Sequence, residues 1–262
     1  MDKMEERTRQ RILDLANLAD RRGIITYTDF LNLNEQNIFH STVGKVSFVK
    51  WKLFGGYAKA ERQLAAFLPD ALYFRYAWND DQTEDPISFP ITCLKIRPVN
   101  LRFSEELSHR DYLGAILNLG IDRSVIGDIL IDGRYTYIFC MEHIIGVIKE
   151  QLDQVRHTRV FVEEVSWEET GYVQKYKKKE GFVASMRLDV LVSQAFSLSR
   201  NISEKLLKSQ KVFHNGKMCL SGGQKIKQGD IISVRGYGKF LVEDLGKTSK
   251  KGRQFITLAI FQ

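Results

Sequence analysis

Residues Ser185–Arg235 read SMRLDVLVSQAFSLSRNISEKLLKSQKVFHNGKMCLSGGQKIKQGDIISVR and form the most informative stretch of the chain. Apolar residues at helical spacing predict two short helices, over residues 187–196 and 202–210. The dipeptide Asn215-Gly216 favours a two-residue hairpin turn, and the β-branched run at 231–235 is typical of a strand. We therefore expect two helices packed against a small sheet.

The apolar residues of the two helices are expected to be core. They are Leu188, Leu191, Val192 and Ala195 in the first helix, and Ile202, Leu206 and Leu207 in the second. Ser199 or Asn201 is predicted to cap the second helix. The cations then face outward, with the Arg187 guanidinium free at the start of the first helix.

Positive charge is concentrated in the C-terminal third. Residues 172–253 hold 18 Lys/Arg and 6 Asp/Glu, a net charge of +12, whereas the whole chain carries +7. The remainder is therefore acidic, with a net charge of −5. Clustered positive charge of this size attracts a polyanion, although a basic face can also serve solubility alone.

Twelve residues of this module are predicted to contact RNA, as phosphate-binding cations or neighbouring polar groups: Arg187, Ser199, Arg200, Asn201, Lys205, Lys208, Lys211, Asn215, Lys217, Lys225, Lys227 and Arg235. A second basic set lies in a predicted hairpin loop between strands at 239–245 and 254–261: Lys247, Lys250, Lys251 and Arg253.

Composition is typical of a folded globular chain: 262 residues, 44% hydrophobic and 27% charged. The three cysteines lie far apart and, with the five histidines, show no zinc-ligand spacing, so we expect reduced thiols and neither a metal nor a cofactor. Residues 1–20 are too charged for a signal peptide, and no apolar run is long enough to span a membrane. We expect a cytoplasmic monomer.

Two polar seams, at residues 79–86 and 168–181, divide the chain. They predict an α+β chain of three small modules, over residues 1–80, 87–167 and 182–262. The first module is a mixed α/β segment that begins with a helix at 4–19. Its acidic balance argues against continuous RNA contact and is compatible with a protein partner there.

The middle module is predicted to follow the order strand, helix, hairpin, helix, strand, over residues 87–99, 104–120, 126–140, 141–155 and 159–165. Ser104 is the expected cap of its first helix, and Asp132-Gly133 the expected hairpin turn. This βαββαβ order is that of a ferredoxin-like fold. The aromatic strand signature of RNA-recognition motifs is absent, so the sequence does not predict base stacking on this sheet.

The C-terminal module resembles the S4-type RNA-binding domain. The matching residues are Arg187-Leu188-Asp189, Ser199-Arg200, the Val212 to Gly216 turn, and the G-D-x-I-x-V run at Gly229–Val234. The chain departs from that family at two turns, where Gln210 replaces a usual glycine and Ser221-Gly222-Gly223 replaces a usual proline.

The resemblance extends over nearly the whole chain. AERQLAAFLPD at 60–70, HRDYLGAILNLGIDRSVIGDI at 109–129 and the C-terminal module are similar to the bacterial YlmH family. That resemblance implies a ribosome-associated protein that binds ribosomal RNA and tRNA on the large subunit. It further implies a role in ribosome-associated quality control, in which obstructed peptidyl-tRNA is held while the nascent chain receives a C-terminal tail. Family members also carry the label of cell-division proteins.

Catalytic look-alikes are few. His109-Arg110-Asp111 matches a kinase triplet, but the required Asn and glycine loop are missing. Asp189 lies in an R-L-D tripeptide like that of pseudouridine synthases, and helix stabilisation is the favoured interpretation. His109, Asp111 and Asp128 form a further candidate set. We expect a non-enzymatic protein; an RNA-modifying enzyme and a cell-division factor that binds proteins or acidic lipids are the alternatives.

Overall fold

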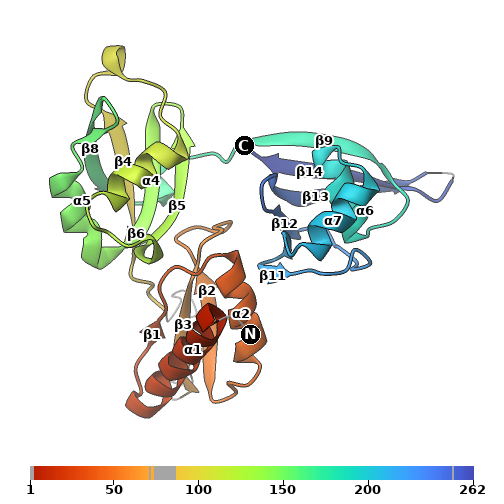
Figure 1. The fold of residues 1–262 in the computed structure, drawn as a ribbon, viewed down its shortest axis with the longest axis horizontal. Coiled ribbons are helices and arrows are strands. Elements are labelled where there is room, and N and C mark those ends of the chain that lie inside the picture. Colours follow the sequence, from red (N-terminus) through yellow and green to blue (C-terminus); the bar gives the residue numbers. More distant parts are fainter. Residues whose placement is uncertain (1–2, 71, 74–86, 250) are drawn as a thin grey trace. The chain divides into compact units, whose positions relative to one another are not determined.

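The computed structural model describes residues 3–70, 72–73, 87–249 and 251–262 (Figure 1). The chain divides into two compact units, residues 1–172 and residues 173–262, which we describe separately. The predicted seam at residues 79–86 lies outside the described residues. Across the described part of the chain, no helix is long and apolar enough to cross a bilayer. All three cysteines are buried free thiols.

The N-terminal part of unit 1 packs two helices on a three-stranded sheet. Helices α1 (Lys3–Arg22) and α2 (Leu33–Val43) accompany strands β1 (Thr26–Tyr27), β2 (Val49–Phe54) and β3 (Leu64–Pro69), in the order β1-β3-β2. All six residues of β3 are buried, which suits a central strand. The mixed helix and strand expected here is confirmed.

The middle part of unit 1 has the ferredoxin-like fold. Its elements are β4 (Ile91–Pro98), α4 (His109–Leu117), β5 (Ile126–Asp132), β6 (Tyr135–Met141), α5 (Ile145–Gln151), the short β7 (Gln154–Val155) and β8 (Thr158–Val165). The sheet is antiparallel in the order β5-β6-β4-β8-β7, so β4 lies between β6 and β8 and the first and last long strands are neighbours. This arrangement is the split βαβ topology that the sequence predicted.

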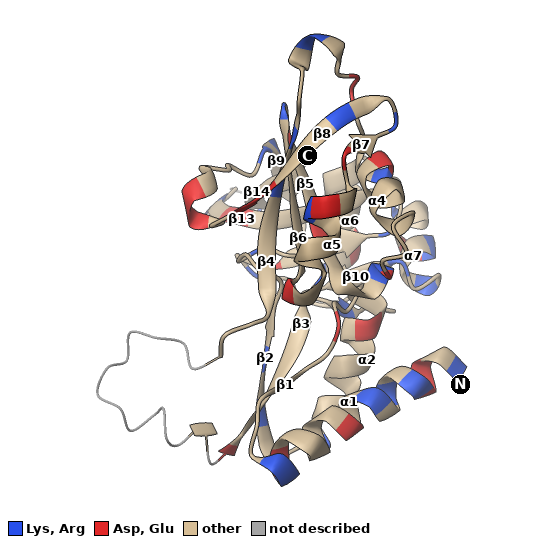
Figure 2. Ribbon diagram, turned by 90° about the vertical axis from the view of Figure 1, so that its left-hand side faces the viewer, with Lys and Arg blue, Asp and Glu red and all other residues tan. Residues whose placement is uncertain are grey.

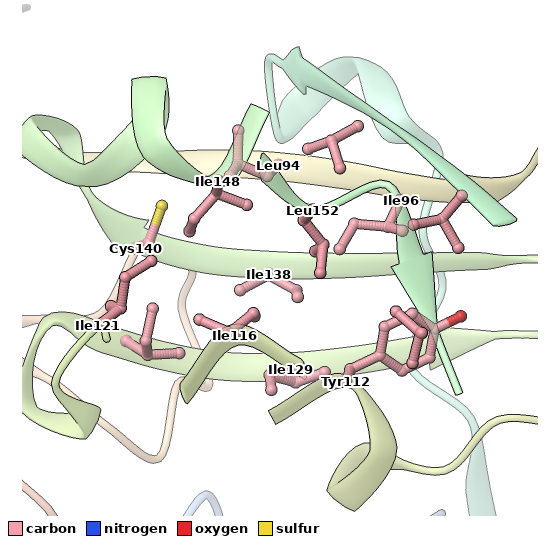
Figure 3. Close-up of a cluster of buried hydrophobic side chains, with 14 of the residues drawn as sticks. Leu94, Ile96, Tyr112, Ile116, Ile121, Ile129, Ile138, Cys140, Ile148 and Leu152 are labelled. Atoms are coloured by element: carbon pink, nitrogen blue, oxygen red, sulfur yellow. The ribbon is translucent and has the colours of Figure 1, made fainter. Parts of the chain in front are cut away.

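One face of this sheet is covered by the two helices. Tyr112 and Ile116 of α4 and Ile148 of α5 pack against Leu94 and Ile138 of the central strands (Figure 3). These side chains point toward the helices because alternate strand residues share a face. The opposite face of the sheet carries no described helix.

Two local predictions in the middle part are wrong. Helix α4 begins after Ser108 instead of Ser104, because the Asp111 carboxylate accepts hydrogen bonds from the Ser108 backbone and hydroxyl at 2.8 and 2.6 Å. The hairpin loop is Gly133-Arg134, one residue later than expected, since Asp132 pairs with Tyr135. Only Gly133 has a positive φ, as in a type II′ turn.

Aromatic packing joins the two parts of unit 1. Tyr57 stacks on Phe139 with ring centroids 5.0 Å apart, and Trp167 covers both rings at 5.4 and 5.0 Å. Gly56 allows the close approach, because a Cβ there would lie 2.3 Å from the Phe139 ring.

Unit 2 is a six-stranded antiparallel sheet with two helices. Its elements are β9 (Tyr176–Val183), α6 (Leu188–Phe196), α7 (Arg200–Lys208), β10 (Val212–His214), β11 (Lys217–Met218), β12 (Ile231–Val234), β13 (Gly238–Thr248) and β14 (Gln254–Phe261). The strand order is β11-β10-β12-β13-β14-β9. Both predicted helices, the Asn215-Gly216 hairpin and the late basic hairpin are present.

Strand β9 is the main departure from expectation in unit 2. Its sequence YKKKEGFV reads largely as a polar boundary segment, yet all eight residues pair with β14. Lysines are common on edge strands, where they discourage pairing with other chains. Gly181 and Val183 face α6, since a Cβ on Gly181 would lie 2.5 Å from Gln194 and Val183 is buried in the core.

Candidate nucleic-acid interface

An ion pair closes the first turn of α6. Arg187 donates to both Asp189 oxygens, from Nε to Oδ1 at 3.0 Å and from Nη2 to Oδ2 at 2.9 Å. Asp189 is buried, while half of the Arg187 side chain stays exposed. Hydrogen bonding to Asp189 and its charge raise the pKa of Arg187. The prediction of a free Arg187 guanidinium is therefore wrong. Asp189 stabilises the start of α6, which is the role that the sequence favoured for it.

The outward face of α7 is polar and cationic. Asn201, Lys205 and Lys208 are exposed on it, and Lys and Arg recur along this helix in Figure 2. Ser199 caps the helix by accepting a 3.3 Å hydrogen bond from the Ile202 backbone. Residues three or four apart share a helical face, so Lys205 and Lys208 lie side by side.

The inward face of α7 differs from the prediction at one residue. Leu206 and Leu207 are buried as expected, but Ile202 is 40% exposed. The fully buried position is Ser203, whose hydroxyl lies 2.7 Å from that of Ser193 on α6. A buried hydroxyl needs a hydrogen-bond partner. The partner of Ser203 lies on the other helix, so the spacing of apolar residues in α7 alone does not reveal that Ser203 is buried.

Two further cations continue the outward face beyond α7. The Arg235 backbone donates a 2.8 Å hydrogen bond to the Lys211 carbonyl, which places the two exposed residues side by side. Arg235 also lies over the Phe213 ring at 5.2 Å. We call Lys205, Lys208, Lys211 and Arg235 together the α7 cationic face.

The Asn215-Gly216 turn is held by side-chain hydrogen bonds. Both residues have a positive φ, 47° and 79°, as a type I′ turn requires. The Asn215 amide donates to Asp230 at 2.9 Å and its oxygen accepts from the Ile231 backbone at 2.9 Å. Asn215 is exposed, but both ends of its side-chain amide are hydrogen-bonded within the turn, so its main role is to hold the shape of the turn.

Asp230 is the centre of this network. Its carboxylate also accepts from the Lys227 backbone at 2.7 Å and lies 2.9 Å from the His214 ring. Burial alone would raise the pKa of Asp230, but hydrogen bonds from Lys227 and Asn215 and the nearby His214 hold it below its usual value. Lys217, Lys225 and Lys227 are exposed around this turn.

The loop before Lys225 packs against the start of α6. Arg187 forms a β-bridge with Lys225, and the Asp189 backbone donates to the Gly222 carbonyl at 3.3 Å. A Cβ on Gly222 would lie 2.6 Å from the Asp189 Cβ. A glycine is therefore required at residue 222, within the stretch Ser221-Gly222-Gly223 where the chain departs from the S4 family.

All twelve predicted contact residues are exposed. Arg200 lines a separate cavity together with Lys179 and Arg253. Lys247, Lys251 and Arg253 are exposed at the β13–β14 hairpin, whereas Lys250 lies outside the described residues. The sequence prediction missed the lysines of β9, because their strand forms only through pairing with β14.

The sheet face opposite the helices is covered at Tyr137 and Phe139 by aromatic packing, but it carries exposed cation–aromatic pairs elsewhere, and Lys95 of one pair also lies 3.8 Å from Glu163. Arg97 lies over the Phe161 ring at 4.7 Å, and Lys95 over the Tyr135 ring at 4.2 Å. Phe161 and Tyr135 are 47% and 39% exposed. Exposed aromatics beside cations on this part of the face are suited to base stacking, which the sequence did not predict.

The candidate catalytic carboxylates have structural partners. Asp111 caps α4 through Ser108, and Asp128 accepts hydrogen bonds from the Tyr57 hydroxyl and the Glu61 and Arg62 backbone. Burial and the charge of Arg123 lower the pKa of His109, against the opposing effect of Asp128. In the described part of the chain no cluster of His, Cys, Asp or Glu could hold a metal ion.

Comparison with protein families agrees with this architecture. Residues 5–70 match the family described as "YlmH, N-terminal", and residues 86–169 match "Putative RNA-binding domain in YlmH". The chain belongs to the YlmH family. Residues 186–232 match the "S4 domain", so the S4 match covers α6, α7 and the hairpin that follows, while the YlmH matches lie in unit 1.

Two similar proteins have informative names. The chain is 25% identical over 231 residues to "Ribosome-associated protein quality control protein P2" of Bacillus subtilis (strain 168), covering 88% of this chain and 85% of that protein. A solved structure, "Cell division protein ylmH" from Streptococcus pneumoniae, is similar with a TM-score of 0.50 at 18% identity, covering 65% of this chain and 96% of that one. The second likeness shows the fold alone.

Proposed function

We propose that this chain is a non-enzymatic RNA-binding factor that binds ribosomal RNA and tRNA on the large ribosomal subunit. The observation that carries the proposal is the α7 cationic face, four exposed cations on and beyond one helix of an S4 domain. Cations of this kind bind phosphate oxygens and release counterions, without reading sequence. The name of the Bacillus subtilis relative supports association with the ribosome.

The middle sheet supplies a second RNA contact in this proposal. Arg97 and Lys95 would meet phosphates, while Phe161 and Tyr135 would stack on unpaired bases. With two RNA-binding surfaces, one chain can hold a tRNA-bearing subunit more tightly than either surface alone. Following the family resemblance, we propose that the complex it stabilises carries peptidyl-tRNA during C-terminal tailing of a stalled chain.

Cosedimentation of the full chain with purified large subunits tests this proposal. The double variant Lys205→Gln/Lys208→Gln should weaken binding, and each lost phosphate contact should reduce the slope of log affinity against log salt by about one unit. Arg187 is left intact, since it holds Asp189. The matched control is Arg21→Gln/Arg22→Gln, which removes the same charge from the exposed end of α1.

The control separates a specific face from total charge. We expect the α1 variant to cosediment like the unmodified chain. Equal binding by the Lys205/Lys208 variant and the control, with equal salt slopes, would show that the α7 cationic face does not bind the ribosome.

A further inference from the structure

A cavity of 520 Å³ opens between β9, the α6–α7 turn and the β13–β14 hairpin of unit 2. Three cations line it, Lys179, Arg200 and Arg253, and among the described residues of its wall none is Asp or Glu. A cleft lined by charges of one sign concentrates their potential and attracts ions of the opposite sign. The cavity is therefore suited to an anion.

Strand β9 directs Lys179 toward this cavity and its neighbour Lys178 away from it. Alternate residues of a strand share a face, and Gly181 faces α6, so Lys179 lies on the α6 side as well. Lys178 lies on the opposite face of the sheet, where its ammonium is 2.9 Å from Glu243. Two adjacent lysines of one strand thus have different surroundings.

The Lys179 ammonium is held in place by the α6–α7 turn. It donates to the Ser197 hydroxyl and, at 3.4 Å, to the Ala195 carbonyl at the end of α6. An ammonium has three donors, so one remains for an anion. Because its side chain is already ordered, Lys179 loses less conformational freedom on binding than a mobile lysine does.

The described part of the wall offers hydrogen-bonding groups but no ring for stacking. Ser197 and Gln194 contribute a hydroxyl and an amide beside apolar side chains. Phe182 is the one aromatic residue among the described residues of the wall, and its ring lies on the opposite face of β9, 5.2 Å from the Phe255 ring. Cations and hydrogen-bonding groups without a ring suit a phosphate and not a nucleobase.

Helix α7 connects this cavity with the α7 cationic face. Arg200 is the first residue of the helix, and Lys205 and Lys208 lie toward its last turn. A helix of nine residues is only about 13 Å long. One RNA strand that lies along α7 can therefore reach both the cavity and the α7 cationic face, which favours RNA over a free phosphate ion as the source of the anion.

We infer that this cavity binds the phosphodiester backbone of an RNA strand through Lys179, Arg200 and Arg253. The two guanidinium groups can each bind a phosphate through two parallel hydrogen bonds, and the ammonium adds a third positive charge. Lys179 and Arg253 lie outside the residues matched by the S4 domain, so β9 and the β13–β14 hairpin extend its RNA-binding surface. The inference rests on the proposed RNA binding and adds a second place where the backbone is held.

The salt dependence of binding tests the inference with the full chain and purified large-subunit ribosomal RNA. Lys179→Met and Arg253→Gln should each reduce the slope of log affinity against log salt by about one unit, because each removes one phosphate contact. Arg253→Gln is included because Lys179 also holds the end of α6, whereas Arg253 lies on an exposed hairpin. An unchanged slope in either variant overturns the inference.

The matched control is Lys178→Met, which removes the same charge from the neighbouring residue of β9. Its salt slope should equal that of the unmodified chain, because Lys178 pairs with Glu243 and is absent from the cavity wall. A reduction as large as that of Lys179→Met would assign the effect to total charge and overturn the inference. The cosedimentation test of the α7 cationic face stands in either case, whereas a chain that does not bind the RNA at all overturns the proposed function as well.

A second measurement identifies the anion. The methyl resonances of Val190 and Leu198, which line the cavity, should shift when a short RNA duplex is added to the unmodified chain, and should shift less in Lys179→Met. Inorganic phosphate at the same phosphate concentration, and polyglutamate, should leave them unchanged. Equal shifts with inorganic phosphate would make the cavity a site for free phosphate, and equal shifts with polyglutamate a site for an acidic protein; either result contradicts the inference.

Discussion

The Tyr57 hydroxyl donates a 2.7 Å hydrogen bond to Asp128 Oδ2, across 71 residues of sequence. Burial and the charge of Asp128 raise the pKa of Tyr57 well above its usual value, so the hydroxyl stays a donor. Asp128 also accepts from the Glu61 and Arg62 backbone at 2.7 and 3.1 Å. One carboxylate of the middle sheet thus anchors the loop that leads into β3.

Tyr57→Phe should lower the free energy of unfolding by about 1.5–3 kcal/mol, because a hydrogen bond to a charged acceptor is lost. Urea denaturation of the full chain measures the change. Tyr135→Phe is the control, because the Tyr135 ring is exposed on the sheet. Removing the Tyr135 hydroxyl should lower the free energy of unfolding by less than about 0.5 kcal/mol. Equal stability of the two variants would contradict the anchoring role.

Gln210→Gly should raise stability by about 1 kcal/mol. Gln210 has a φ of +60° just after α7, where a Cβ is strained and glycine is not. Gln228→Gly is the control and should lower stability: Gln228 has no positive φ, and glycine there adds freedom to the unfolded chain and removes the 3.1 Å hydrogen bond from Gln228 Nε2 to the Glu243 carbonyl. A Gln210→Gly variant that unfolds at lower urea concentration than the unmodified chain would show that the left-handed conformation is not costly.

The helical register of α7 gives a third prediction. Ile202→Ala should cost less than about 1 kcal/mol, because Ile202 is 40% exposed, whereas Leu206→Ala should cost about 2–5 kcal/mol by leaving a cavity in the core. Thermal unfolding of both variants makes the comparison. Similar losses for the two would place Ile202 inside the core after all.

Asp230 makes the hairpin around Asn215 sensitive to acid. Its folded-state pKa is held low, so the stabilisation it contributes is present above the ordinary carboxyl pKa of about 4 and is lost as pH falls through the lower folded value. Hydrogen exchange of residues 211–235, corrected for the intrinsic rate, should therefore accelerate below pH of about 4.

Asp230→Asn serves as the comparison for that experiment. It should reduce protection of residues 211–235 near neutral pH and remove most of the acid dependence. Protection that falls with acid to the same extent in both chains would assign the effect to another group.

Local patterns explain which parts could be predicted. Helix α6 and the Asn215-Gly216 turn follow from residues close in sequence, an apolar stripe and a dipeptide that tolerates positive φ. Strand β9 could not be predicted, because its three lysines do not read as a strand and its structure comes from pairing with β14.

In the candidate site, too, the features that depend on nearby residues could be predicted and those that depend on distant residues could not. Exposure of the cations could be predicted from helical spacing, but their grouping could not. Arg187 is engaged by a residue two positions later, whereas Arg200 joins Lys179 of β9 and Arg253 of the β13–β14 hairpin, which are distant in sequence. The burial of Ser203 likewise depends on Ser193 of the other helix.

The pairing of β9 with β14 has a consequence for synthesis. The S4 match at residues 186–232 is synthesised before β14, and until β14 emerges β9 lacks the one described strand it pairs with. Its lysine-rich edge stays exposed for that interval, and these charges disfavour pairing with another nascent chain. Completion of the sheet then fixes Lys179 against Ser197, so the cavity forms only once β14 has paired with β9.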